Sequence, residues 1–281
     1  MRFSADFRRT GFSLPHWAIA ATLIAAACTP NGRSRHSSAR GKAGHVPTIN
    51  MKDGLNVRVK LYSGEAITVK ADSYAFTSGN NTRRGSGSFT FTEEGVLQPK
   101  GFFVLRQRRY VGALEAKREG GSWLYINHVP IDEYLTSVVS HEMSPSWHSE
   151  ALKAQAVVSR TYLLTKMKER ANKPFDVDTT TNFQVYGGLK KDDAGARAAV
   201  SDTHNEVLYH GSDLAQTFFH SSCGGTLASA QEVWGRPVPY LNVQNSPYCS
   251  AAPVYKWQVK IPMKEIGRRL ALRGVRHVSV A

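Results

Sequence analysis

The sequence predicts an α+β protein, in which a small antiparallel β unit precedes a mixed domain with two consecutive helices packed on short strands. Short segments of alternating apolar and polar residues recur between residues 55 and 128, as half-buried strands require. Two segments with helical spacing follow one another between residues 130 and 166, and strand-like segments resume after them. The 281 residues, 41% of them hydrophobic, suffice for one large domain or two small ones with a packed core.

Residues 1–28 have the features of an export signal. Arg8 and Arg9 precede an apolar run at residues 17–27, which is too short for a typical membrane span. Small residues stand immediately before Cys28, so we expect a signal peptidase to cut there and Cys28 to be lipidated as the mature N-terminus. Simple cleavage and an uncleaved anchor are the alternatives. The predicted location is outside the cytoplasm, as a membrane-anchored lipoprotein or a protein that faces the periplasm or cell wall.

A flexible tether is predicted at residues 29–54, where Ser, Gly, Arg and Pro are frequent and large apolar side chains are few. The β unit of residues 55–128 begins with a strand in which Val57 and Val59 face one side and Arg58 the other. Further strands are expected at residues 66–70, 88–92, 102–105, 110–115 and 123–127, with a turn at residues 78–81.

The mixed domain, residues 129–281, opens with the two helices. Pro130 suits the first position of a helix that runs to about Glu142. Ser149 is the expected N-cap of the second helix, because residues 151–166 are rich in good helix formers. The remaining expected elements are a helix near residues 193–200, strands at 206–209, 215–219 and 256–261, a turn at 222–225 and a short helix at 263–271.

The charge balance points to an anionic partner. Lys and Arg outnumber Asp and Glu by 36 to 22, which gives a net charge of +14. Such a surface attracts nucleic acid, anionic lipid headgroups or acidic cell-wall polymers. Export favours the cell wall, since nucleic acid is scarce outside the cytoplasm and peptidoglycan carries lactyl and peptide carboxylates. We therefore expect no nucleic-acid partner.

Cysteine usage agrees with export. Once Cys28 is set aside as a lipid site, Cys223 and Cys249 remain as one pair, which we interpret as a disulfide. Closing a loop of that size would stabilise the fold by about 3 kcal/mol. Two reduced thiols are the alternative, and a zinc site needs more ligands than this pair offers.

Several motifs follow one another in order through the mixed domain. They are residues 125–135 (Tyr-Ile-Asn-His-Val-Pro-Ile-Asp-Glu-Tyr-Leu), 138–143 (Val-Val-Ser-His-Glu-Met), 150–162 (Glu-Ala-Leu-Lys-Ala-Gln-Ala-Val-Val-Ser-Arg-Thr-Tyr), 184–187 (Gln-Val-Tyr-Gly), 218–226 (Phe-Phe-His-Ser-Ser-Cys-Gly-Gly-Thr), 233–234 (Val-Trp) and 239–241 (Pro-Tyr-Leu). In this order they resemble the stage II sporulation protein D (SpoIID) family, which includes the amidase enhancer (LytB) domain. The resemblance extends from about residue 55 to residue 273.

The resemblance implies a lytic transglycosylase that cleaves the bond between N-acetylmuramic acid and N-acetylglucosamine, best known on glycan without stem peptides. Some relatives hold zinc through His and Cys just before the Gln-x-Tyr segment. Here Asn182 and Phe183 precede Gln184, so we expect no metal and no cofactor. Full-length relatives also carry a Gly-rich segment near the C-terminus, and residues 129–281 are expected to be short of it.

Glu142 is the candidate catalytic residue. A lytic transglycosylase can work with one carboxyl group, because the muramic acid's own 6-hydroxyl attacks the anomeric carbon and the same Glu first donates and then accepts a proton. The end of a helix, with Met143 and Trp147 nearby in sequence, would favour the protonated form. A solvated residue at a helix end is the alternative interpretation of Glu142.

Five further side chains are candidates for substrate binding. Polar donors at these positions suit sugar hydroxyls and acetamido groups, one tyrosine ring could stack on a pyranose, and one arginine could bind a carboxylate. Each of these residue types is also common as a structural residue. They are Gln184, Tyr186, His220, Ser222 and Arg160.

The sequence thus leaves two principal functions and one minor one. The first is a transglycosylase that acts on peptidoglycan glycan strands. The second is a non-catalytic cell-wall-binding protein that stimulates an amidase, for which a cell-wall amidase would be the partner. The third, an anionic-lipid or nucleic-acid binder, rests on charge alone.

Overall fold

The computed structural model describes residues 54–180, 182–252, 255–256, 258–269 and 271. The predicted export signal, Cys28 and nearly all of the predicted tether lie outside this part of the chain. The chain divides into two compact units, with the boundary between His220 and Ser221. Each unit is described by itself.

The first unit is built on a mixed sheet, and the α+β class predicted from the sequence is confirmed. Eight strands pair antiparallel, and the short last strand pairs parallel with the first. The order across the sheet is β6-β5-β2-β4-β7-β8-β1-β9, and β3 pairs with β2 outside this path. The strands are β1 (Asn56–Gly64), β2 (Thr68–Ser78), β3 (Asn81–Thr90), β4 (Gly95–Pro99), β5 (Phe102–Leu105), β6 (Arg108–Val111), β7 (Ala113–Glu119), β8 (Ser122–Pro130) and β9 (Val177–Asp178).

Alternation along the strands explains most of this sheet. Val57 and Val59 are buried while Arg58 between them is partly exposed, as the sequence predicted. Two differences have local causes. The segment predicted at residues 110–115 divides into β6 and β7 at Gly112, whose positive φ of 84° and close approach to the His128 carbonyl leave no room for a side chain. Strand β4 was not predicted, because it is too short and too mixed in composition to show a clear alternation of apolar and polar residues.

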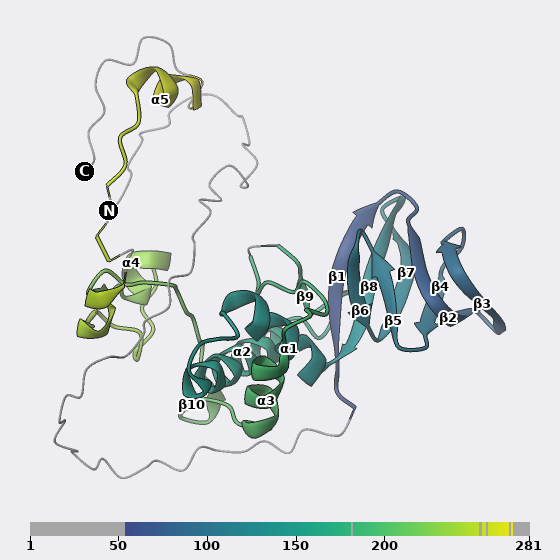
Figure 1. The fold of residues 1–281 in the computed structure, drawn as a ribbon, viewed down its shortest axis with the longest axis horizontal. Coiled ribbons are helices and arrows are strands. Elements are labelled where there is room, and N and C mark those ends of the chain that lie inside the picture. The colour runs from purple at the N-terminus through teal and green to yellow at the C-terminus, as the bar shows by residue number, and fades with distance from the viewer. Residues whose placement is uncertain (1–53, 181, 253–254, 257, 270, 272–281) are drawn as a thin grey trace. The chain divides into compact units, whose positions relative to one another are not determined.

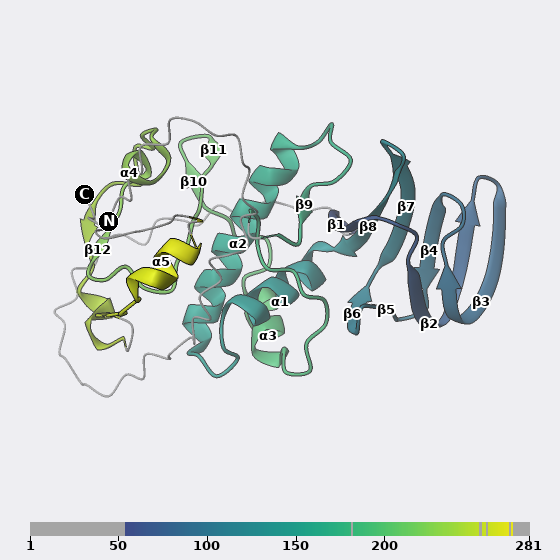
Figure 2. The ribbon, with the colours of Figure 1, turned by 90° about the horizontal axis from the view of Figure 1, so that it is seen from above.

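Three helices of the same unit pack together beside the β8 and β1 strands (Figures 1 and 2). Helix α1 continues directly from β8, and its Ile131 N–H donates to the Leu55 carbonyl that precedes β1, at 3.1 Å. This junction fixes the direction of α1 relative to the sheet. The helices are α1 (Ile131–Glu142), α2 (Ser149–Glu169) and α3 (Ala194–Asp202).

The helix starts differ from the sequence predictions by one residue each. Pro130 occupies the N-cap position of α1 and not its first turn. His148, not Ser149, caps α2, because its Nδ1 accepts the Glu150 N–H at 3.2 Å. Imidazole can replace a hydroxyl as the acceptor at a helix start, so the usual cap residue shifts into the first turn.

The strand predicted at residues 206–209 overlaps the two-residue strand β10 (Tyr209–His210) only at Tyr209, and β10 pairs with β11 (Asp213–Leu214). The strand predicted at residues 215–219 is wrong, because these residues have no regular structure. The second unit contains β12 (Thr226–Leu227), α4 (Ala230–Trp234), β13 (Gln244–Asn245), a 3-10 helix (Pro247–Ala251) and α5 (Met263–Arg269). The strand predicted at residues 256–261 is wrong over the described residues 258–261, which have no regular structure. Apolar and polar residues alternate along this segment, but among the described residues no strand pairs with it.

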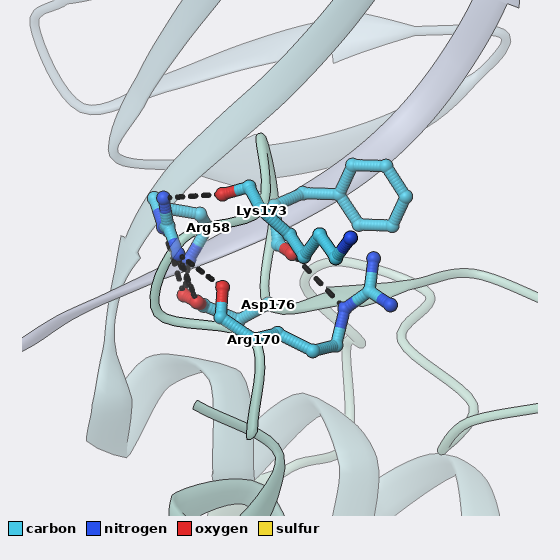
Figure 3. A network of polar contacts seen from close by, with 5 residues as sticks. Arg58, Arg170, Lys173 and Asp176 are labelled. Carbon is cyan, nitrogen blue, oxygen red and sulfur yellow. Dashed lines mark hydrogen bonds and ion pairs between the residues drawn. The ribbon is translucent and has the colours of Figure 1, made fainter. Parts of the chain in front are cut away.

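An ion pair joins β1 to the segment that leads from α2 to β9 (Figure 3). Arg58 donates from Nη2 to Asp176 Oδ1 at 2.6 Å, and its backbone N–H donates to Asp176 Oδ2 at 2.8 Å. The same guanidinium donates to the carbonyls of Lys173 and Arg170. Hydrogen bonding to Asp176 raises the pKa of Arg58 above its usual value. We call this set the Arg58 clamp; it fixes the start of the chain segment that runs through β9 toward Gln184.

Candidate active site around Glu142

Glu142 is the last residue of α1 and is half-buried. Its Oε1 accepts the backbone N–H of Val185 at 3.0 Å. Among the described residues, Oε2 has no hydrogen-bond partner. One carboxylate oxygen is therefore held in place, and the other is the oxygen that can exchange a proton with a ligand.

The Val185 N–H belongs to the segment of residues 184–189, at the start of which buried and exposed side chains alternate. Gln184 and Tyr186 are buried, at 3% and 2% exposure, whereas Val185 between them is 42% exposed. The Tyr186 hydroxyl donates to Asn127 Oδ1 at 2.7 Å. Its ring lies against Tyr134, with centroids 5.1 Å apart. The two buried side chains anchor the segment so that the Val185 N–H points at Glu142.

This arrangement changes the role predicted for Gln184 and Tyr186. Burial raises the pKa of Tyr186 well above its usual value, and its ring is enclosed by core residues, so it is not presented to a pyranose. The Gln184 amide lies 3.4 Å from both the Tyr134 hydroxyl and the Ser159 carbonyl. The buried Gln184 and Tyr186 side chains therefore position the Val185 N–H at Glu142 from within the protein core.

Two glycines complete the same segment. Gly187 lies directly under the His141 ring, and a Cβ there would overlap it. Gly188 has φ +78° and lies against the Arg109 carbonyl. Its own carbonyl accepts the Ser137 hydroxyl at 2.8 Å, and the following Leu189 N–H donates to the Arg109 carbonyl at 2.7 Å. Only glycine fits these positions.

His141 was not singled out in the sequence, although it precedes Glu142. Its Nδ1 lies 2.7 Å from the Ser137 carbonyl; because a carbonyl can only accept, Nδ1 carries the hydrogen. Burial lowers the pKa of His141, with smaller lowering contributions from Lys190 and Arg108. The ring is therefore neutral at pH 7, with Nε2 as an acceptor beside Glu142. The Val185 N–H was missed for a different reason: a backbone donor leaves no signature in residue type.

Arg160 does not lie in an open binding site. Its side chain is fully buried at 0% exposure. The guanidinium donates to the carbonyls of Val200 at 3.0 Å and Glu206 at 3.2 Å, and lies 3.4 Å from the Thr203 hydroxyl. Burial lowers the pKa of Arg160. The predicted carboxylate ligand is replaced by the carbonyl end of α3, where a cation is stabilised by the helix dipole.

His220 and Ser222 are separated by the boundary between the two units. His220 is exposed at the end of the first unit, and Ser222 is half-buried in the second. The Ser222 hydroxyl is buried without a hydrogen-bond partner among the described residues. The structure brings Gln184 and Tyr186 together with Glu142 but gives no such grouping for these two residues.

The second unit also contains the predicted disulfide pair. Cys223 and Cys249 are free thiols in this structure, and their sulfurs lie 3.2 Å apart. A hydrogen bond with Ser246 is the largest cause of a lowered pKa for Cys223. The two thiols are neighbours, and their oxidation to a disulfide stays a prediction.

Two negative findings apply to the part of the chain that the structure describes. No group of three or more His, Cys, Asp and Glu side chains is arranged to hold a metal ion. No helix there combines the length and apolar character that crossing a bilayer requires.

We expect Gly188→Ala to disturb the site by moving the 184–189 segment. An alanine would meet both an unfavourable positive φ and the Arg109 carbonyl, so the Val185 N–H would leave Glu142. The free energy of unfolding should fall by about 1–3 kcal/mol more than in Gly101→Ala, since Gly101 has φ +91° with open space around its Cβ position. Chemical denaturation of both variants measures this difference. Equal losses would show that the segment is not held by the close approach.

Comparison with known proteins adds family information. Residues 119–210 match the family model described as stage II sporulation protein, SpoIID. An uncharacterized protein of Brachyspira hyodysenteriae is 34% identical over 226 residues, which cover 80% of this chain and 61% of that protein. The amidase enhancer of Bacillus subtilis is 41% identical over 107 residues, 38% of this chain and 14% of the relative. Stage II sporulation protein D of Bacillus subtilis is 29% identical over 163 residues, 53% and 48% of the two chains. The chain thus spans less than two thirds of each relative's length.

Proposed function

Because residues 119–210 of this chain belong to the SpoIID family, we propose that the protein is a peptidoglycan lytic transglycosylase with Glu142 as its catalytic residue. The proposed substrate is glycan from which the stem peptides have been removed. The names of its relatives support a role in the cell wall. The finer assignment is supported by the site around Glu142.

One observation carries the proposal most strongly. Glu142 lies within the family region, and the Gln-x-Tyr-Gly segment of the same region holds its Oε1 through the Val185 N–H at 3.0 Å. Two motifs that are 43 residues apart in sequence are therefore joined at one carboxylate. A carboxyl group fixed through one oxygen, with the other open, has the geometry that a proton donor to a glycosidic oxygen requires.

The proposed reaction needs one carboxyl group. Glu142 protonates the glycosidic oxygen from Oε2, and the bond from that oxygen to the muramic acid anomeric carbon breaks. The resulting carboxylate then takes the proton of the same sugar's 6-hydroxyl, whose oxygen forms the new bond to the anomeric carbon. Water is not consumed, the product ends in a 1,6-anhydro ring, and the carboxyl group is regenerated.

Digestion of purified glycan tests the proposal. The wild-type chain is incubated with intact and with peptide-stripped peptidoglycan, and the products are identified by mass spectrometry. We expect 1,6-anhydro-muramic acid ends, with more product from stripped glycan. Products with reducing ends alone would indicate a hydrolase, and the absence of any product from stripped glycan with correctly folded protein would contradict catalysis.

A second candidate function is favoured by one comparison. The amidase enhancer of Bacillus subtilis is 41% identical over its matched 107 residues, so a protein that binds the wall and stimulates an amidase is the alternative. In that case the chain would bind stripped glycan without cleaving it and would increase the rate of an added cell-wall amidase. Both functions act on the wall, and we propose action outside the cytoplasm, with lipid anchoring through Cys28.

A further inference from the structure

Strand β6 is an edge strand of the sheet, and its two consecutive arginines face opposite ways. Arg109 pairs with Val104, and its guanidinium lies 4.9 Å from the Phe102 ring centroid. Arg108 shares the other face with Tyr110, two residues along the strand. The Tyr110 ring lies 5.7 Å from Tyr186, so Arg108 is on the face of β6 that receives the 184–189 segment.

A second cation, Lys190, lies at the end of α1. Lys190 directly follows that segment, and its Nζ donates to the Ser140 carbonyl at the end of α1 at 2.6 Å. This carbonyl belongs to the last turn, which has no intrahelical donors. Lys190 is otherwise exposed, so its ammonium keeps two further N–H donors available two residues before Glu142.

His141 is close enough to both cations to be affected by their charge. Its imidazole pKa is lowered mainly by burial, and Lys190 and Arg108 both add to the decrease. Their positive charges therefore act on one ring, next to Glu142. Neither Arg108 nor Lys190 forms an ion pair with a carboxylate among the described residues, whereas Lys153, Lys166 and Arg197 each do. Two cations that lack a carboxylate partner and lie near a reactive carboxyl group are suited to an anionic ligand.

We propose that Arg108 and Lys190 form a carboxylate-binding subsite beside Glu142, which recognises the carboxylates of the glycan substrate. This inference rests on the proposed function, since it takes peptidoglycan as the ligand. The carboxylate has two sources: the lactyl group of muramic acid, which is free only after the stem peptide is removed, and the stem peptide itself. The subsite makes affinity depend on the charge of the substrate and not only on its sugar rings.

Binding measurements test this subsite without depending on turnover. The full chain with Glu142→Gln is titrated calorimetrically with peptide-stripped glycan oligosaccharides, with the same oligosaccharides whose lactyl carboxylates are reduced to alcohols, with peptide-bearing glycan and with chitin oligosaccharides of equal length. Arg108→Gln and Lys190→Gln are each added to this background. Arg109→Gln is the matched control, because it removes an equal charge from the opposite face and keeps the carbonyl that binds Leu189.

We expect Arg108→Gln and Lys190→Gln each to weaken binding of stripped glycan by about tenfold, which corresponds to one charge-assisted hydrogen bond. Binding of the reduced glycan and of chitin oligosaccharides should not change, and Arg109→Gln should match the background. Lys190→Arg keeps both the positive charge and a donor for the Ser140 carbonyl, so it should bind stripped glycan as well as the background does. A loss confined to peptide-bearing glycan would support the subsite and identify the stem peptide as the source.

Two results would overturn the inference. One is unchanged binding of both charged glycans in Arg108→Gln and Lys190→Gln; the other is an equal loss for charged and uncharged oligosaccharides, which would indicate a general structural defect. The outcome is independent of cleavage. A wild type that cleaves while these variants bind normally would leave the proposed function intact, and an inactive wild type can still show the charge preference.

Discussion

Glu142→Gln is expected to lower glycan cleavage by a factor of about 100 or more, the range for loss of a general acid and base. Glutamine keeps the acceptor oxygen for the Val185 N–H at 3.0 Å, so the 184–189 segment should stay in place. The amide cannot donate and regain a proton in the way that the reaction requires. Release of 1,6-anhydro products from stripped glycan measures the rate, and circular dichroism checks the fold.

Glu150→Gln is the matched control for this experiment. Glu150 lies in the first turn of α2, is exposed, and pairs with Lys153 at 3.2 Å. An exposed pair of this kind contributes less than about 1 kcal/mol, so cleavage should remain at the wild-type rate. If Glu142→Gln cleaves as fast as Glu150→Gln, another group performs the proton transfer and the assignment of Glu142 is wrong.

Arg160→Ala is expected to lower the free energy of unfolding by about 3–5 kcal/mol. The side chain is fully buried and donates to the carbonyls of Val200 and Glu206. Its removal leaves a cavity and strands these acceptors away from water. The midpoint of urea denaturation, at an unchanged slope, measures the loss.

Two further variants separate the causes of that loss. Arg160→Met fills much of the same volume without the donors, so any loss that remains reports on the hydrogen bonds. Arg197→Ala removes an arginine that belongs to α3 itself, but its pairs with Glu133 and Asp193 are partly exposed, so we expect a loss below about 1 kcal/mol. Equal stability of Arg160→Ala and wild type would show that the buried guanidinium is not structural, and a role in substrate binding would have to be reconsidered.

Periodicity predicted most of the first unit. The alternation of Val57 and Val59 and the helical spacing after Pro130 arise from burial on one face, which residue type records directly. The end of the first helix at Glu142 was also predicted correctly. These features are local, so one stretch of sequence contains the information that determines them.

The site depends on contacts that no single stretch records. Tyr186 has the residue type of a sugar-stacking side chain, but the core around Asn127 determines that it is buried. Arg160 has the residue type of a carboxylate-binding side chain, but the packing of α3 against it determines that it is buried. The donor to Glu142 is a backbone N–H, which every residue except proline carries. Two-residue strands such as β10 and β11 are too short to have a period.

The Arg58 clamp has a consequence for the order in which the chain folds. It joins two residues that are 118 positions apart, so the loop that it closes has a large entropy cost until the intervening elements have formed. During synthesis, β1 can pair with β8 once residue 130 has emerged. Arg58 gains its Asp176 partner, and β1 gains its β9 neighbour, only when the chain has grown beyond these residues. Chains that end before Asp176 should therefore retain an unpaired edge on β1, which makes them more prone to association than the complete chain.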